Sequence, residues 1–153
     1  MNHLSQLYQY IKTIAEEDSN VNHVIKGTVG EVDLDKMIIP PVVNININSG
    51  SFTNGNTVNF NVELVCLAQR DINKEVRTDD FWEQDNEIDN LNETHAILNR
   101  MWLKMYRDFE KNNITASENP TLTAIIFGTA KLLDGWLLTF EVEMPNDMIS
   151  LCP

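Results

Sequence analysis

Residues 43–66 read VNININSGSFTNGNTVNFNVELVC, and this stretch decides the fold. Before the glycine- and asparagine-rich segment 49–56, Val43, Ile45 and Ile47 alternate with asparagines. After it, an apolar residue stands at every second position from Val58 to Cys66. A period of two is typical of a strand with one buried face. The stretch therefore predicts two long antiparallel strands joined by a flexible connection over 49–56.

Helical periodicity appears on both sides of this hairpin. Apolar residues on one face predict a helix over about 3–16, which ends in the polar run 16–20. Farther along, an apolar or aromatic position recurs every three or four residues, which predicts a long helix over about 86–111. The expected buried seam of this second helix comprises Ile88, Leu91, His95, Leu98, Trp102, Met105 and Phe109.

Short extended segments complete the pattern. We expect them at 21–26 and 29–34, before Pro40-Pro41, and again at 121–127 and 129–133. Asp134-Gly135 predicts a hairpin turn, followed by a final alternating strand that ends at Pro145. The order of elements predicts one α+β domain over residues 1–153. Its antiparallel sheet with long hairpins is packed on one face by the N-terminal helix and the long central helix.

Residues 69–85 follow neither period, so we expect an irregular arm. Phe81 and Trp82 stand there among acidic residues, outside any periodic segment. Aromatic residues projecting from such an arm are typical of hot spots at protein interfaces. An arm that folds back and caps its own core would explain them equally well, and the sequence leaves both interpretations open.

The charge balance excludes several functions. With 23 acidic and 11 basic residues the net charge is −12, and no cluster of Lys or Arg interrupts it, which disfavours binding to the nucleic-acid backbone. The first residues lack the features of a signal peptide, and no apolar run is long enough to span a bilayer. We therefore expect a protein made in the cytoplasm, with no membrane partner. Cys66 and Cys152 have no zinc-site spacing and are expected to be reduced thiols.

No catalytic pattern emerges from the polar residues. The acidic run over 79–93 could hold a metal ion, but acids at a helix start are also stabilised by the helix dipole, and we expect a solvated face. His95 has no convergent partner and is expected to be satisfied and partly buried. Nucleophile elbows and phosphate-binding glycine loops are missing from the sequence. The sequence thus predicts a protein that is not an enzyme and uses neither cofactor nor metal.

Two stretches carry a family resemblance. Residues 30–36 (GEVDLDK) followed by 39–45 (IPPVVNI) resemble the segment that leads into the first long strand of head-to-tail ring proteins of crAss-like and related tailed phages. The ending 133–136 (LDGW), with Phe140, Pro145 and Cys152, is similar to the final strand of the same group. The order of helix, long hairpin, long helix and closing hairpin also resembles that of phage tail-completion and tail-terminator proteins.

This resemblance implies a structural subunit of a homo-oligomeric ring in the neck or tail of a virion, assembled in the host cytoplasm. Its partners would be further copies of itself and neighbouring neck, tail or portal proteins, with DNA passing through the lumen without specific binding. An acidic lumen suits a sliding polyanion. A small carbohydrate- or ligand-binding module that uses the asparagine-rich sheet face is the competing interpretation. The candidate interface residues are Phe52 and Asn54 in the hairpin connection, and Arg70, Arg77, Phe81 and Trp82 in the arm.

Overall fold

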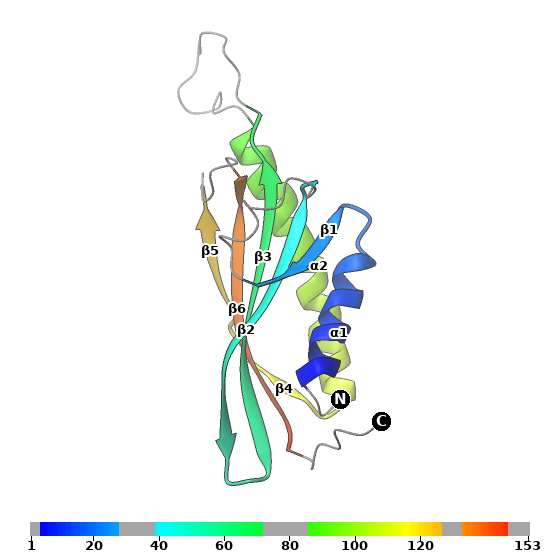
Figure 1. Ribbon diagram of the computed structural model, residues 1–153, viewed down its shortest axis with the longest axis vertical. Helices are drawn as coiled ribbons and strands as arrows, with labels where there is room; N and C mark the ends of the chain where they lie inside the picture. The colour runs from blue at the N-terminus through cyan, green and yellow to red at the C-terminus, as the bar shows by residue number, and fades with distance from the viewer. Residues whose placement is uncertain (1–3, 28–38, 72–85, 127–132, 147–153) are drawn as a thin grey trace.

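The computed structural model describes residues 4–27, 39–71, 86–126 and 133–146, and Figure 1 shows the arrangement of their elements. They form an α+β fold with a six-stranded, mostly antiparallel sheet, which confirms the predicted fold class. The N-terminal helix and the long central helix are the two helices of this part of the chain. In chain order the elements are α1 (Leu4–Glu16), β1 (His23–Lys26), β2 (Val42–Thr53), β3 (Thr57–Gln69), α2 (Glu87–Lys111), β4 (Thr115–Ala116), β5 (Thr121–Ile125) and β6 (Leu133–Pro145).

The sheet has the order β1-β2-β3-β6-β4, and β5 also pairs with β6. β1 runs parallel to β2, whereas the other pairings are antiparallel. β3 is the central strand, because it pairs with β6 over its whole length on one side and with β2 from Thr57 to Leu67 on the other. The main core lies between this sheet and the two helices, and it includes Leu7, Ile11, Leu64, Met105 and Phe140.

The two helices have nearly the predicted bounds, but the buried face of α2 differs from the expected seam. Leu98, Met105 and Phe109 are buried as predicted. In the first turns, however, Asn90 and Thr94 are buried and His95 is exposed. The expectation that His95 is partly buried is therefore wrong. The reason is that the start of α2 packs on a buried polar group of the sheet, described below, so that its inward side is polar there.

β2 continues farther than predicted. It runs to Thr53, and only residues 54–56 form the turn, where Asn54 and Gly55 have φ angles of 51° and 72°. A register shift between Ile47 and Ser49 exchanges the faces of the strand, so that Gly50 pairs with Phe60. A Cβ at Gly50 would lie 3.0 Å from the Phe60 ring, which explains the glycine. We call residues 48–61 the distal hairpin; Figure 1 shows it extending past both helices.

Asp134-Gly135 is part of β6 and not a hairpin turn, which corrects the prediction. Asp134 is completely buried and pairs with Arg70. A Cβ at Gly135 would come within 1.7 Å of the carbonyl oxygen of Cys66, so only glycine fits there. Asp134 is needed for a buried ion pair, and Gly135 is needed because two strands lie close together there. Aspartate and glycine are also the residues that favour a turn, which is why the sequence suggested one. β6 ends at Pro145 as expected.

Candidate functional site

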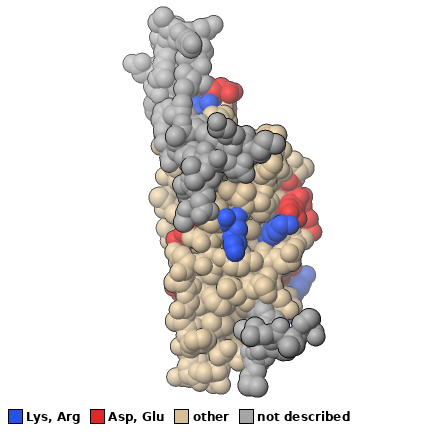
Figure 2. Space-filling model, viewed as in Figure 1, with Lys and Arg blue, Asp and Glu red and all other residues tan. Residues whose placement is uncertain are grey.

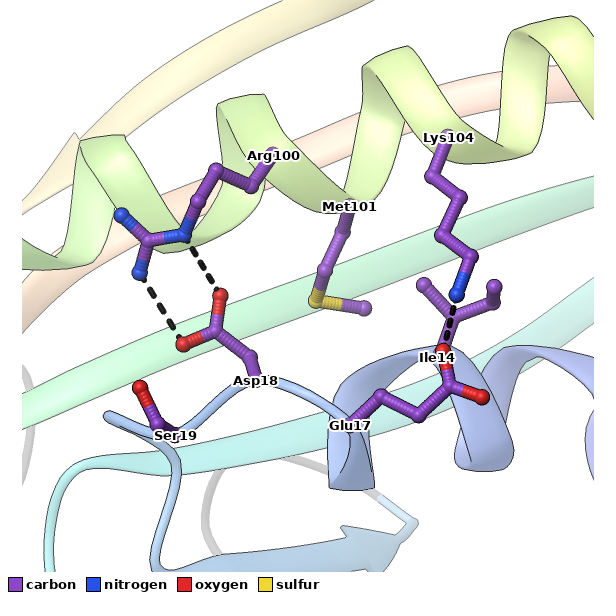
Figure 3. A pocket seen from close by; sticks show the side chains of 7 residues that line it. All are labelled: Ile14, Glu17, Asp18, Ser19, Arg100, Met101 and Lys104. Atoms are coloured by element: carbon purple, nitrogen blue, oxygen red, sulfur yellow. Dashed lines mark hydrogen bonds and ion pairs between the residues drawn. The ribbon is translucent and has the colours of Figure 1, made fainter.

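The first candidate site is a cleft between the end of α1 and the middle of α2, which we call the helix cleft (Figure 3). It has a volume of about 320 Å³, and Ile14 and Met101 supply apolar lining. Arg100 donates two hydrogen bonds, of 2.8 and 3.0 Å, to the Asp18 carboxylate, and Lys104 pairs with Glu17. In Figure 3, both pairs join α2 to the turn that directly follows α1.

These ion pairs determine what the helix cleft can do. Burial acts to raise the pKa of Asp18, but hydrogen bonds from Arg100 and from the Asn20 backbone outweigh it and lower that pKa. The same hydrogen bond raises the pKa of Arg100. Both groups stay charged and bound to each other near neutral pH, so neither is poised to transfer a proton. These ion pairs therefore hold the end of α1 against α2, and they provide no pair of groups for acid–base catalysis.

A second polar group lies inside the protein where β3, β6 and the start of α2 meet. The Arg70 side chain is 2% exposed and donates hydrogen bonds of 2.7 and 2.8 Å to the two carboxylate oxygens of Asp134. It also donates a bond of 2.8 Å to Glu87. Asn90 donates to the Gln69 carbonyl at 2.9 Å, which ties the same helix to the end of β3. This group is fully engaged and holds α2 against the sheet.

Arg70 was expected on the irregular arm, as a candidate residue of a subunit interface. The structure places it in the interior of its own subunit, because the alternation of β3 continues past Ala68 and directs position 70 toward the helices. Arg77, Phe81 and Trp82 lie outside the described residues. Phe52 and Asn54, by contrast, lie at the exposed end of the distal hairpin.

Two further titratable groups have raised pKa values, which keep them protonated. Burial raises the pKa of the Cys66 thiol, which keeps it protonated and unreactive. Burial, together with the hydrogen bond of 2.6 Å that its hydroxyl donates to Asp108, raises the pKa of Tyr10. Within the described ranges, no group of three or more His, Cys, Asp or Glu side chains is arranged to hold a metal ion. None of the helices in this part of the chain is both long and apolar enough to cross a membrane.

The β2 half of the distal hairpin is exposed at every residue from Asn48 to Thr53. Phe52 is 76% exposed, more than any other large apolar side chain described. Asparagine side chains at the base of the hairpin form hydrogen bonds between the two strands: Asn61 donates to Asn48 at 3.0 Å, and Asn48 donates to Glu63 at 2.9 Å. On the face seen in Figure 2, the surface at this end of the molecule shows hardly any charged residues. The distal hairpin therefore combines rigid backbone pairing with an unburied aromatic side chain.

A small apolar cleft lies between β5 and α2, at the edge of the sheet that is farther from β2. We call it the β5 cleft; its volume is about 70 Å³. Leu122 of β5 is 41% exposed at its rim, and Trp102 packs against Phe140 with ring centres 4.9 Å apart. The sequence predictions did not include this cleft, although the uncharged run NPTLTAIIFGTA over 119–130 could have indicated it. The lining residues are His95, Leu98, Asn99, Trp102, Pro120, Leu122 and Leu138.

Comparison with known proteins adds no assignment: no protein-family model matches the chain, and no curated protein matches its sequence.

Proposed function

We propose that this chain is a structural subunit of a homo-oligomeric ring in the neck or tail of a tailed bacteriophage. There it joins head to tail or completes the tail, and DNA passes through the lumen. The observation that carries the proposal is the distal hairpin, a paired and uncharged extension of the sheet that ends in an exposed Phe52. Extended, uncharged strands with an exposed aromatic are suited to contacts between subunits.

The charge of the chain supports the same role. At −12, the subunit repels DNA, so a ring of such subunits lets the polyanion pass without holding it. The basic side chains of Arg70, Arg100 and Lys104 are paired with acids of the same subunit, so their charges are not directed toward DNA. The other copies of the chain, and portal, neck or tail proteins above and below, are the partners of this proposal. In this proposal the assembled subunit is located in the virion.

The asparagine-rich face gives less support to a ligand-binding module. Asn48, Asn59 and Asn61 each use their amide in a hydrogen bond across the hairpin. These three side chains therefore offer a sugar fewer free hydrogen-bond donors.

The test is the assembly state of the purified chain. Size-exclusion chromatography with light scattering, over a hundredfold range of protein concentration, should show a defined multimer, and electron microscopy of that fraction should show closed rings. A chain that stays monomeric throughout the range, and whose hairpin amide resonances shift when a carbohydrate is added, would overturn the proposal in favour of the ligand-binding module.

A further inference from the structure

Two different edges of the sheet carry no partner strand among the described residues. β2 pairs with β1 only through Val42–Ile45, so the outer edge of residues 48–53 is open. β5 pairs with β6 through Thr121–Ile125, and no described strand lies on its other side. Open edges present unpaired backbone N–H and C=O groups and bind other strands readily. Proteins normally protect such edges with charged residues or proline, and both of these segments lack them.

Both edges are uncharged in a strongly acidic protein. The charge-free runs that contain them are Met37–Val62 and Asn119–Ala130, and these are the two longest in the sequence. Two copies of a chain with a net charge of −12 repel each other, and this repulsion is weakest where the contacting surfaces carry no charge. A second copy of the chain is therefore the occupant that these edges fit.

The directions of the strands agree with this pairing. β2 is antiparallel to β3, β3 to β6, and β6 to β5, so β2 and β5 run in opposite directions. If the next copy keeps the same strand direction, its β2 meets β5 as an antiparallel neighbour. The sheet then continues from one subunit into the next with regular antiparallel hydrogen bonding.

The directions of the side chains are also compatible with this pairing. Leu122 pairs with Leu138, which is buried on the helix side of the sheet, and Phe52 pairs with Val58, which belongs to the same helix-side core. Phe52 and Leu122 thus project from the same face of the sheet. In a continuous sheet they can stand opposite each other as an aromatic–aliphatic pair, a combination that stabilises adjacent strands. The Phe52 ring would then cover the β5 cleft beside Trp102.

We infer that residues 48–53 of one copy add to the open edge of β5 in the next copy, with Phe52 packed against Leu122 at the rim of the β5 cleft. This inference rests on the proposed function, because it names the contact between neighbouring subunits of the ring. The two surfaces are different, so the contact is head-to-tail, and repetition closes a ring when the rotation between copies allows it.

Disulfide cross-linking tests the contact directly. Ser51→Cys and Thr123→Cys stand opposite each other when Phe52 faces Leu122 across antiparallel strands, and they keep both of those side chains. They are made separately, each with Cys152→Ser, which leaves only the buried Cys66 as a native thiol. Residues opposite each other on adjacent strands have Cα atoms about 4.5–5.5 Å apart, which a disulfide can span. Under mild oxidation, a mixture of the two variants should give a covalent dimer at about ten times or more the yield of either variant alone.

The outcomes separate this inference from the proposed function. Strong cross-linking of the Ser51→Cys variant alone would indicate a symmetric two-fold contact and overturn the inference. Multimers that form without a cross-link in the mixture would also overturn it, while leaving the ring intact. A chain that remains monomeric would overturn both.

A second measurement does not depend on cysteine chemistry. Phe52→Ala should abolish the multimer while leaving the melting temperature of the monomer unchanged, because the side chain is exposed in the free subunit. Leu103→Ala is the matched control, since Leu103 is 49% exposed on α2 and lies outside the β5 cleft. It should leave assembly as it is. Equal loss of assembly in both variants would contradict a specific role for Phe52.

Discussion

The two ends of the β2–β3 hairpin use the same backbone pairing but differ in what covers them. Near the helices, Val43, Leu64 and Cys66 are completely buried, and both helices pack on that face. In the distal hairpin the ladder continues to Thr53 and Thr57, yet most of β2 there is exposed. Hydrogen bonding thus extends over the whole hairpin, whereas apolar burial is concentrated in one part. Because burial supplies most of the folding energy, the covered part stabilises the subunit and the distal hairpin is free for contacts.

The largest effect should come from removing a core aromatic of the covered part. Phe140 is 2% exposed and packs against Trp102, so Phe140→Ala should lower the free energy of unfolding by about 4 kcal/mol. Phe52→Ala removes the same atoms from the distal hairpin and should change it by about 0.5 kcal/mol or less. Urea denaturation of the monomer measures both. Similar losses for the two variants would show that the distal hairpin is part of the folding core.

The buried ion pair should give the next largest effect. Asp134→Asn keeps the shape of the side chain but leaves the Arg70 guanidinium without its main counter-charge, which should cost about 3 kcal/mol. Glu87→Gln is the matched control: this carboxylate also binds Arg70 but is 20% exposed, so water can replace part of the interaction. Its cost should be about 1 kcal/mol or less. If Asp134→Asn were as mild as Glu87→Gln in chemical denaturation, Arg70 would not depend on Asp134.

Periodicity predicted the covered part well, for a physical reason. One-sided burial repeats every two residues in a strand and about every 3.6 in a helix, and α1, α2, β3 and β6 each follow such a repeat for three turns or six residues at least. The distal part of β2 was missed because no described helix or strand covers its faces. Without a buried face, residues 49–53 have no reason to alternate, and the bulge after Ile47 also exchanges the two faces.

The polar residues of the interior were predicted less well, because their partners are far away in the sequence. Asp134 and Gly135 have the local signature of a turn, but Asp134 is held by Arg70, 64 positions earlier, and Gly135 by the approach of β3. Asn90 and Thr94 were left out of the α2 seam because polar residues do not count in an apolar repeat. The β5 cleft was missed because it arises only when Leu122 and Trp102 meet through the fold.

The turn of the distal hairpin should give a smaller and purely local effect. Gly55 has a φ of 72°, and no atom lies near the position of a Cβ, so Gly55→Ala tests backbone strain alone. An L-residue with a side chain in this conformation costs about 1 kcal/mol. Gly55→Asn should cost clearly less, since asparagine tolerates left-handed φ. Amide hydrogen exchange should show faster opening of residues 50–58 in the alanine variant, with the core amides unchanged. Loss of protection throughout the core would instead indicate that the turn is needed for folding.

The smallest effect concerns pH, and it should be confined to the covered part of the molecule. Hydrogen bonds from Arg100 and Asn20 hold the pKa of Asp18 below its ordinary value of 3.8 in the folded protein. A carboxylate with a lowered folded-state pKa stabilises the fold above its unfolded pKa, and this contribution disappears as the pH falls through the folded value. Asp18→Asn should therefore cost about 0.5 kcal/mol at pH 7, as expected for a pair half exposed on the Arg100 side, and less at pH 3, below the unfolded-state pKa. The distal hairpin has no charged residue between 48 and 61, so assembly through Phe52 should not depend on this titration.

Denaturation of the wild type and the variant at both pH values measures the effect on stability, and light scattering of the variant at pH 7 measures the effect on assembly. A variant that fails to assemble while keeping its stability would link the helix cleft to the subunit contact, and the division between a folding part and a contacting part would no longer hold.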